Sequence, residues 1–82
     1  MKARVIIYTR PGCHLCEEAK EAIEQADCAK YYTLGAVNIE SDAELLKRYS
    51  NDIPVVTING TEAFRHRVDP GKFRDAIVKA TA

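Results

Sequence analysis

The sequence has no excess of either charge and no long apolar segment. Its 82 residues include 12 basic and 12 acidic side chains, so the formal net charge is zero. This balance argues against a basic surface for nucleic acid or an anionic membrane, and we expect neither as a partner. The apolar run Val5–Tyr8 near the start is too short for a signal peptide or a membrane span. We therefore expect a soluble protein without a cleaved export signal.

Repeats, low-complexity stretches and linkers are also lacking, and the length permits one domain, which we assign to residues 1–82. The composition, 46% hydrophobic and 29% charged, is ordinary for a globular protein and argues against disorder. Cysteine is scarce, with three residues, and an odd number does not suit a static disulfide framework. Without an export signal, these cysteines indicate a reducing compartment, so we expect a cytoplasmic location.

What is present is an alternation of strand and helix patterns. Residues 3–9 form an apolar, β-branched run, which predicts a strand buried on both faces. The segment Arg10–Gly12 interrupts this run, and an apolar stripe then predicts a helix from about 13 to 27. A second strand is expected within 31–39, with its first half poorly defined because of Gly35.

The second half of the chain carries three turn and cap signals. Ser41 followed by Glu44 fits a capping box and predicts the start of a short helix. Asn59–Gly60, after the apolar run 55–58, predicts a hairpin with a type I′ turn, because Asn and Gly tolerate positive φ. Asp69–Pro70 supplies an N-cap and a first-turn proline for a last helix. The buried stripe of this helix is expected to comprise Phe73, Ala76, Ile77 and Ala80.

These elements follow one another in the order β-α-β-α-β-β-α. The first β-α-β unit requires parallel pairing of its strands, whereas the Asn-Gly turn requires an antiparallel pair. The sequence therefore predicts an α/β fold, with a four-stranded mixed sheet and helices on both of its faces.

Two cysteines, Cys13 and Cys16, lie where the first strand gives way to the first helix. Helix positions three apart share one face at about 5 Å, which suits a disulfide that opens and closes without backbone rearrangement. Cys13 falls at the helix N-terminus, where free N–H groups and the macrodipole favour a thiolate. Cys13 is therefore the expected nucleophile. Cys16, on the apolar stripe, is expected to be buried and to resolve a mixed disulfide.

Neighbouring charges act on Cys13 in opposite directions. Arg10 and a protonated His14 would lower the pKa of its thiol, whereas Glu17, one turn on, would raise it. His14 is otherwise expected to face solvent, and His66 is expected to be an ordinary strand residue.

Other uses of the cysteines are weighed against redox chemistry. A closed zinc site needs four ligands, and Cys28 and the two histidines form no second pair at zinc-knuckle spacing. No metal ligand is therefore assigned, although zinc stays an alternative. Haem attachment requires a histidine directly after the second cysteine, where Glu17 stands. Cys28 is expected to be a small buried hydrophobe, with a regulatory thiol or a dimer-forming disulfide as the alternative.

The residues around these cysteines resemble a known family. The segment Tyr8–Cys16, with Ile53–Val55 and Asn59–Gly60 downstream, resembles the glutaredoxins, and more closely a small branch of glutaredoxin-like proteins. The resemblance extends over roughly residues 4–78. It implies a thioredoxin-like fold of the glutaredoxin type.

Carried over by position, the resemblance implies that Cys13 is the nucleophile, that Cys16 is the resolving thiol, and that Pro54 is a cis proline facing them. Taken by itself, Pro54 is a proline at a strand start, where proline is tolerated. In the family, backbone beside this proline pairs with an extended substrate, and here that backbone belongs to Ile53. The residues expected to contact substrate are therefore Arg10, His14, Ile53 and Pro54.

The chain departs from the family after the hairpin. Glutaredoxins carry a Gly-Gly pair and then Asp residues, which bind the free amino acid end of glutathione. This chain has Phe64–Arg65 at the glycine positions and His66–Val68 near the acidic ones. Bulky side chains replace close backbone approach, and cations replace anions. Glutathione is accordingly a candidate co-substrate that is expected to bind weakly, differently or not at all.

These features predict a small thiol–disulfide oxidoreductase that reduces a protein disulfide or a glutathione-mixed disulfide. No tightly bound cofactor is expected, and the protein is expected to be a monomer. Two alternatives belong to other classes. One is an iron–sulfur carrier shared between two protomers, which the altered glutathione pattern disfavours. The other is an inactive scaffold that binds a partner through its surface.

Overall fold

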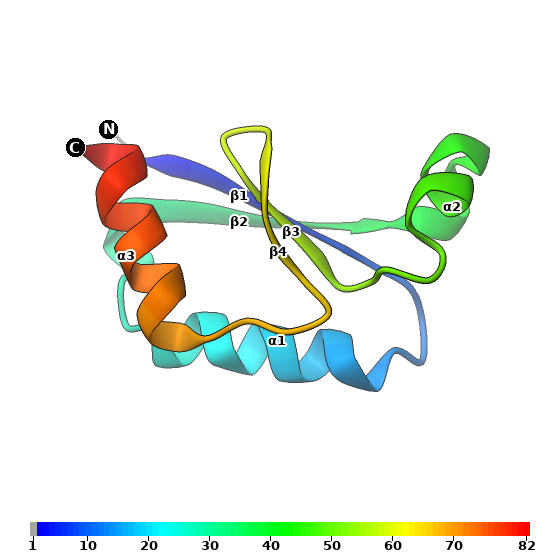
Figure 1. The fold of residues 1–82 in the computed structure, drawn as a ribbon, viewed down its shortest axis with the longest axis horizontal. Coiled ribbons are helices and arrows are strands. Elements are labelled where there is room, and N and C mark those ends of the chain that lie inside the picture. The colour runs from blue at the N-terminus through cyan, green and yellow to red at the C-terminus, as the bar shows by residue number, and fades with distance from the viewer. Residues whose placement is uncertain (1) are drawn as a thin grey trace.

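The computed structural model describes residues 2–82, which form four strands and three α-helices (Figure 1). In chain order they are β1 (Ala3–Thr9), α1 (His14–Gln25), β2 (Tyr32–Asn38), α2 (Ala43–Tyr49), β3 (Val55–Ile58), β4 (Thr61–Arg65) and α3 (Pro70–Thr81). Short 3-10 turns, Ala29–Tyr31 and Ile39–Ser41, flank β2. This is the order predicted from the sequence. None of these helices is both long and apolar enough to cross a membrane.

The strands form one mixed sheet in the order β2-β1-β3-β4. β1 runs parallel to β2 and antiparallel to β3, and β3 pairs antiparallel with β4. The β3–β4 pair follows from the Asn59–Gly60 turn, in which both residues have positive φ, 51° and 85°. The prediction that the first half of the second strand is poorly defined is wrong. Gly35 pairs with Ile6, and β2 pairs with β1 without interruption from Tyr32 to Asn38.

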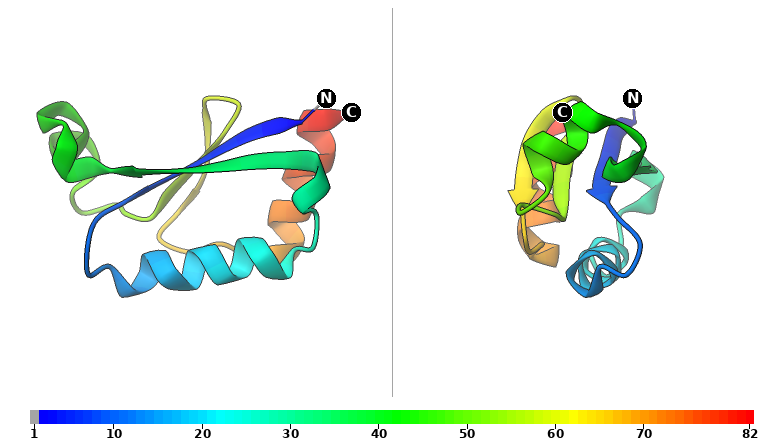
Figure 2. Two further views of the ribbon diagram at one scale, coloured as in Figure 1. Left: turned by 180° about the vertical axis from the view of Figure 1, so that it is seen from behind. Right: turned by 90° about the vertical axis from the view of Figure 1, so that its right-hand side faces the viewer.

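The two faces of the sheet are covered unequally. α1 and α3 lie along one face, and α2 lies on the opposite side at one end (Figures 1 and 2). The main core lies under α1 and α3, where Ile23, Phe73 and Ile77 pack on β1 and β3. The Phe73 ring packs edge-on against the Tyr32 ring, with the ring centroids 5.4 Å apart. The centroid of the Phe64 ring lies 6.1 Å from that of Phe73. A smaller apolar cluster comprises Cys16, Ile39, Tyr49, Ile53 and Val55.

The prediction that the first strand is buried on both faces is wrong. Val5 and Ile7 point into the main core and are fully buried, but Arg4 is exposed and Tyr8 is half-buried. The reason is that α2 covers only one end of the second face. There Tyr49 packs on Tyr8 with ring centroids 5.0 Å apart, while Arg4, towards the other end of β1, stays in solvent.

α2 begins one residue later than the capping-box pattern predicts. Asp42 is the N-cap, and its carboxylate accepts the N–H groups of Glu44 and Leu45 at 2.8 and 3.4 Å. Ser41 instead donates its hydroxyl to the Asn38 carbonyl at 2.7 Å, within the 3-10 turn after β2. The capping box is therefore replaced by an aspartate cap.

α3 begins as predicted. Asp69 accepts the N–H of Lys72 at 3.0 Å, and Pro70 occupies the first helical turn. Its buried side is shorter than expected, because Ala80 is exposed and Ile77 is the last fully buried residue.

Candidate redox site

The loop between β1 and α1 positions Cys13 at the start of the helix. Gly12 has a positive φ of 78°, a conformation in which a side chain would be strained. Cys13 is the N-cap residue, and its Sγ accepts the N–H of Cys16 at 3.1 Å. One of the free donors of the helix start is therefore directed at the Cys13 sulfur.

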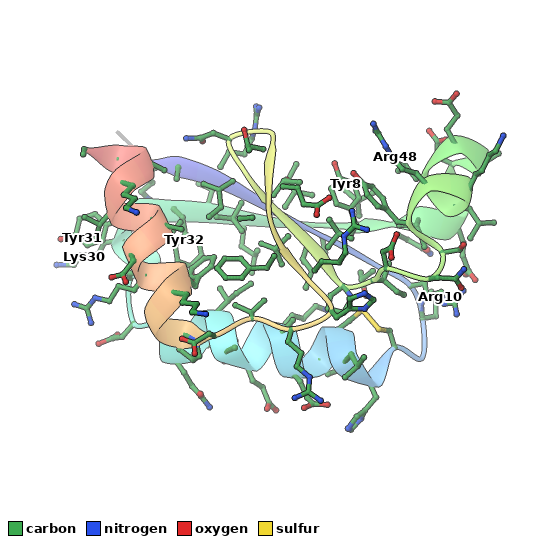
Figure 3. The ribbon with its side chains drawn as sticks, in the orientation of Figure 1. Tyr8, Arg10, Lys30, Tyr31, Tyr32 and Arg48 are labelled. Atoms are coloured by element: carbon green, nitrogen blue, oxygen red, sulfur yellow. A yellow bond between two sulfur atoms is a disulfide. The ribbon has the colours of Figure 1, made fainter. Side chains whose placement is uncertain are left out.

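Cys13 and Cys16 are joined by a disulfide, visible as the yellow bond in Figure 3. Their Cα atoms are 5.2 Å apart, so the three-residue spacing bridges the sulfurs without displacing the backbone. The two residues differ in solvent exposure: Cys16 is fully buried, whereas Cys13 is half-buried. The expected burial of Cys16 is confirmed, and a molecule arriving from solvent can reach only Cys13.

The loop before β3 lies against the disulfide. The Ile53–Pro54 peptide bond is cis, as the family resemblance implied. Pro54 is fully buried, and Ile53 belongs to the apolar cluster that contains Cys16 and that Cys13 packs against. Ile53 therefore lies next to the cysteine pair.

An open hollow with a volume of about 320 Å³ lies in front of Cys13. Its walls bring together three of the four predicted substrate contacts, Arg10, His14 and Ile53. The fourth, Pro54, is buried and lines none of it. Figure 3 shows Arg10 at the disulfide end of the molecule. His14 faces solvent, as expected, with its side chain 90% exposed.

His66 is a residue of this hollow that the sequence analysis missed. The expectation of an ordinary strand residue is wrong, because His66 follows β4, has a positive φ of 70° and lines the hollow beside Cys13. Its N–H donates to the Pro54 carbonyl at 2.8 Å, which ties the end of β4 to the start of β3. No local pattern marks such a histidine, since left-handed positions usually hold Gly or Asn.

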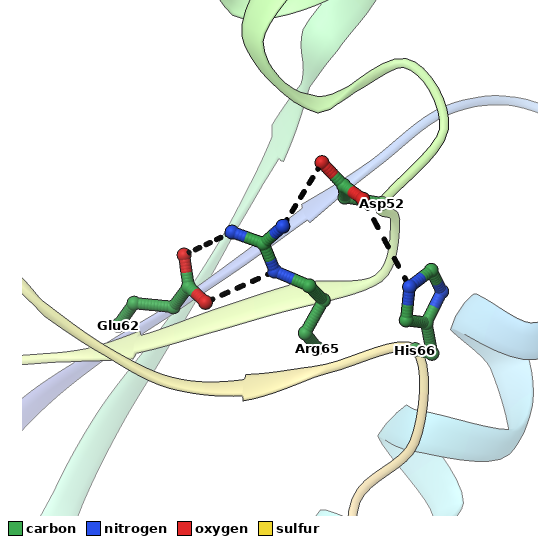
Figure 4. Close-up of polar contacts among 4 residues, drawn as sticks. All are labelled: Asp52, Glu62, Arg65 and His66. Carbon is green, nitrogen blue, oxygen red and sulfur yellow. Dashed lines mark hydrogen bonds and ion pairs between the residues drawn. The ribbon is translucent and has the colours of Figure 1, made fainter.

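Arg65 joins β4 to the loop that precedes β3 (Figure 4). Its Nε and Nη2 donate to the two oxygens of Glu62 at 3.0 and 2.8 Å, and its Nη1 lies 3.1 Å from the Asp52 carboxylate. His66 Nε2 lies 3.9 Å from the other Asp52 oxygen. The hydrogen bonds between Arg65 and Glu62 lower the pKa of the Glu62 carboxyl and raise the pKa of the guanidinium.

Phe64 and Arg65, which stand where glutaredoxins have glycines, point in different directions. Phe64 packs against the main core, whereas Arg65 is held by Glu62 and Asp52. Neither side chain lines the hollow in front of Cys13. That hollow is therefore open to a substrate despite the bulk of these two residues.

The third cysteine lies outside this site. Cys28 is a free thiol and is buried, as expected, and its burial raises its pKa. Among residues 2–82, no group of three or more His, Cys, Asp or Glu side chains is arranged to hold a metal ion.

Known proteins match this chain along nearly its whole length. The model of the glutaredoxin-like domain family (DUF836) matches residues 4–78. The protein belongs to this glutaredoxin-like family. A curated relative, the glutaredoxin-like protein YDR286C homolog of Dictyostelium discoideum, is 35% identical over 71 residues. The match covers 79% of this chain and 66% of that protein, so the chain spans slightly less than two thirds of its relative.

Solved structures show the same fold. XcR50 from X. campestris is 28% identical and has a TM-score of 0.78, over 92% of this chain and 96% of its own. Ne2328 from Nitrosomonas europaea is 24% identical with a TM-score of 0.78, over 100% and 94% of the two chains. A mutant thioredoxin from Halobacterium salinarum, 13% identical, has a TM-score of 0.71 over 99% and 76%. The thioredoxin-like fold is confirmed, and family membership with the Cys13–Cys16 pair indicates a redox function.

Proposed function

We propose that this glutaredoxin-like protein is a thiol–disulfide oxidoreductase that uses Cys13 and Cys16 as its dithiol/disulfide couple. The observation that carries the proposal is the difference between the two sulfurs. A half-exposed sulfur stands at a helix N-terminus and is bonded to a fully buried one three residues on. The N–H of Cys16 and the α1 macrodipole favour the thiolate of Cys13, which is the attacking form.

The reaction proceeds by two exchanges. The Cys13 thiolate attacks one sulfur of the substrate disulfide, a new S–S bond forms, and the other substrate sulfur leaves as a thiolate. Cys16, after losing its proton, attacks Cys13 Sγ and releases the first substrate sulfur. Two electrons pass from the protein dithiol to the substrate, whose two thiolates take up the two protons. A dithiol reductant or two molecules of glutathione then restore the dithiol.

The proposed substrate is a protein disulfide or a glutathione-mixed disulfide bound in the hollow in front of Cys13. Backbone of Ile53 would pair with an extended segment beside Pro54, as in strand addition. Arg10 and His14 line the same hollow and are the proposed side-chain contacts. The protein would act as a monomer in the reducing cytoplasm, without a tightly bound cofactor and with glutathione as a co-substrate.

The test is the redox equilibrium of the pair in defined glutathione buffers, read by mass after alkylation. The proposal predicts a reversible two-electron transition between about −180 and −270 mV, the range of known dithiol oxidoreductases. A disulfide that does not form at any poise, or that forms and cannot be reduced, would refute it.

A further inference from the structure

We propose that the substrate of the redox site is a protein disulfide in which acidic residues flank the cysteine and the surrounding segment is extended. This inference rests on the proposed function. The assignment is based on the charged side chains that line the groove beside Cys13.

The groove consists of two adjoining hollows. The first, in front of Cys13, has Arg10 and His66 in its walls and no Asp or Glu. The second has His66 and Arg67 in its walls, with one carboxylate, that of Glu18. The two hollows share Leu15 and His66 and therefore adjoin, with Arg10 and Cys13 in the first and Arg67 in the second.

Glu18, in the second hollow, and two carboxylates outside the hollows, Glu17 and Asp52, have side-chain partners within the protein, and the partner of Glu18 is a histidine that is cationic only when protonated. The pairs are Glu17–Lys20 at 3.7 Å, Glu18–His14 at 3.3 Å and Asp52–Arg65 at 3.1 Å. Arg10 and Arg67, by contrast, take part in no ion pair within the described residues 2–82. Two exposed guanidinium groups therefore remain along the groove with no carboxylate of the protein to bind.

A guanidinium matches a carboxylate with two parallel hydrogen bonds, and at an exposed site it also attracts the anion during encounter. Arg10 and Arg67 stand in different hollows, so an acidic segment running along the groove meets both. An extended chain would in addition pair with the backbone of Ile53. Glutathione also carries carboxylates, but a small molecule does not need both hollows, so the observations favour a protein segment.

The test compares three disulfide-linked peptide dimers of equal length, with the cysteine flanked by glutamate, glutamine or lysine. The reduced protein is mixed with each, and the rate constant for oxidation of Cys13–Cys16 is divided by that of dithiothreitol with the same peptide. This ratio corrects for the effect of flanking charges on the disulfide itself. The glutamate peptide should react about five- to tenfold faster than the glutamine peptide, and about 0.5 M salt should remove most of the advantage.

Variants separate binding from folding. Arg10→Gln and Arg67→Gln should each reduce the preference about two- to fourfold, and the double variant Arg10→Glu, Arg67→Glu should prefer the lysine peptide. Arg74→Gln on α3, a residue that lines neither hollow, is the matched control and should keep the preference. Circular dichroism checks that every variant is folded.

Each outcome has one meaning. Equal rates for the three peptides, with turnover intact, would overturn the acidic preference and leave the oxidoreductase standing. Oxidised glutathione reacting faster than every peptide, in a manner that depends on Arg10 and Arg67, would overturn the choice of a protein segment. No reaction with any disulfide would instead refute the proposed function.

Discussion

Cys13 and Cys16 are the same residue type, and their difference comes from where α1 begins. Cys13 caps the helix and is half-exposed, whereas Cys16 lies inside the first turn and is fully buried. Cys13→Ser should therefore abolish turnover, because no other sulfur of the pair is accessible. Cys16→Ser should instead accumulate a mixed disulfide between Cys13 and substrate, detectable as added mass that dithiothreitol removes. If both variants are inactive and neither traps substrate, the two cysteines do not divide the roles as proposed.

At the residue scale, the sequence predicts those features that depend only on neighbouring residues in the chain. The Cys-x-x-Cys spacing, the break at Arg10–Gly12 and the apolar stripe that contains Cys16 were enough to predict the buried and exposed members of the pair. His66 could not be predicted in this way. It comes beside Cys13 because β4 ends there, because its own φ is positive, and because its N–H bonds to Pro54 across the chain. Each of these depends on tertiary structure.

Among the elements, β4 is tied to the loop before β3 by Arg65. Arg65→Met would remove its bonds to Glu62 and Asp52 and leave Ile53 less firmly positioned. Because backbone of Ile53 is the proposed partner of substrate, we expect the rate of disulfide exchange to fall roughly three- to tenfold. The loss should appear mainly as a higher KM, since Cys13 and α1 are untouched. Arg74→Met is the control, and an unchanged KM in Arg65→Met would show that the tie does not position the site.

The same pair of residues, Arg65 and Glu62, predicts a dependence on pH. Arg65 lowers the pKa of Glu62 below its ordinary value of 4.5. The folded protein therefore keeps this carboxylate charged at a pH at which the unfolded chain takes up a proton. The stabilisation is complete above about pH 4.5 and is lost as the pH falls through the lowered pKa. The difference in unfolding free energy between the native protein and Arg65→Met should shrink from about pH 6 to pH 3. A constant difference would contradict this assignment.

The start of α2 offers a further test. Asp42 accepts two backbone N–H groups of the helix, whereas Ser41 accepts none of them. Asp42→Ala should cost about 1 kcal/mol in the free energy of unfolding, measured with urea, and Ser41→Ala should cost less. A larger loss of unfolding free energy for Ser41→Ala would instead support the capping box, with Ser41 as the N-cap. From the sequence alone, two adjacent capping residues cannot be ranked, because the choice depends on whether Ser41 closes the 3-10 turn after β2.

For the molecule as a whole, few elements with strong signals were enough to predict the topology. A β-α-β unit and an Asn-Gly hairpin leave little freedom in strand direction, and the mixed sheet follows. The unequal covering of its faces was not predicted, because Val5 and Ile7 on one side of β1 and Ile6 and Tyr8 on the other are all apolar or aromatic, although Arg4 on the second side marks its uncovered end. Arg4 stays exposed because α2, with seven residues, reaches only the end of the sheet where Tyr8 lies, and Tyr8 itself is half-buried against Tyr49.

The proposed thiol–disulfide exchange requires the protein to keep this whole fold in both oxidation states. The Cys13–Cys16 disulfide closes a loop with a sequence separation of only three residues, and the chain-entropy model then gives a contribution of about 2 kcal/mol. The main core under α1 and α3 contains neither cysteine of the pair. Reduction should therefore lower the free energy of unfolding by no more than about 2 kcal/mol and leave the protein folded. Urea unfolding with and without dithiothreitol measures this difference, with Cys13→Ser as a control that should not respond. Unfolding on reduction would mean that the disulfide holds the structure together, and the dithiol form could not then act as the reductant.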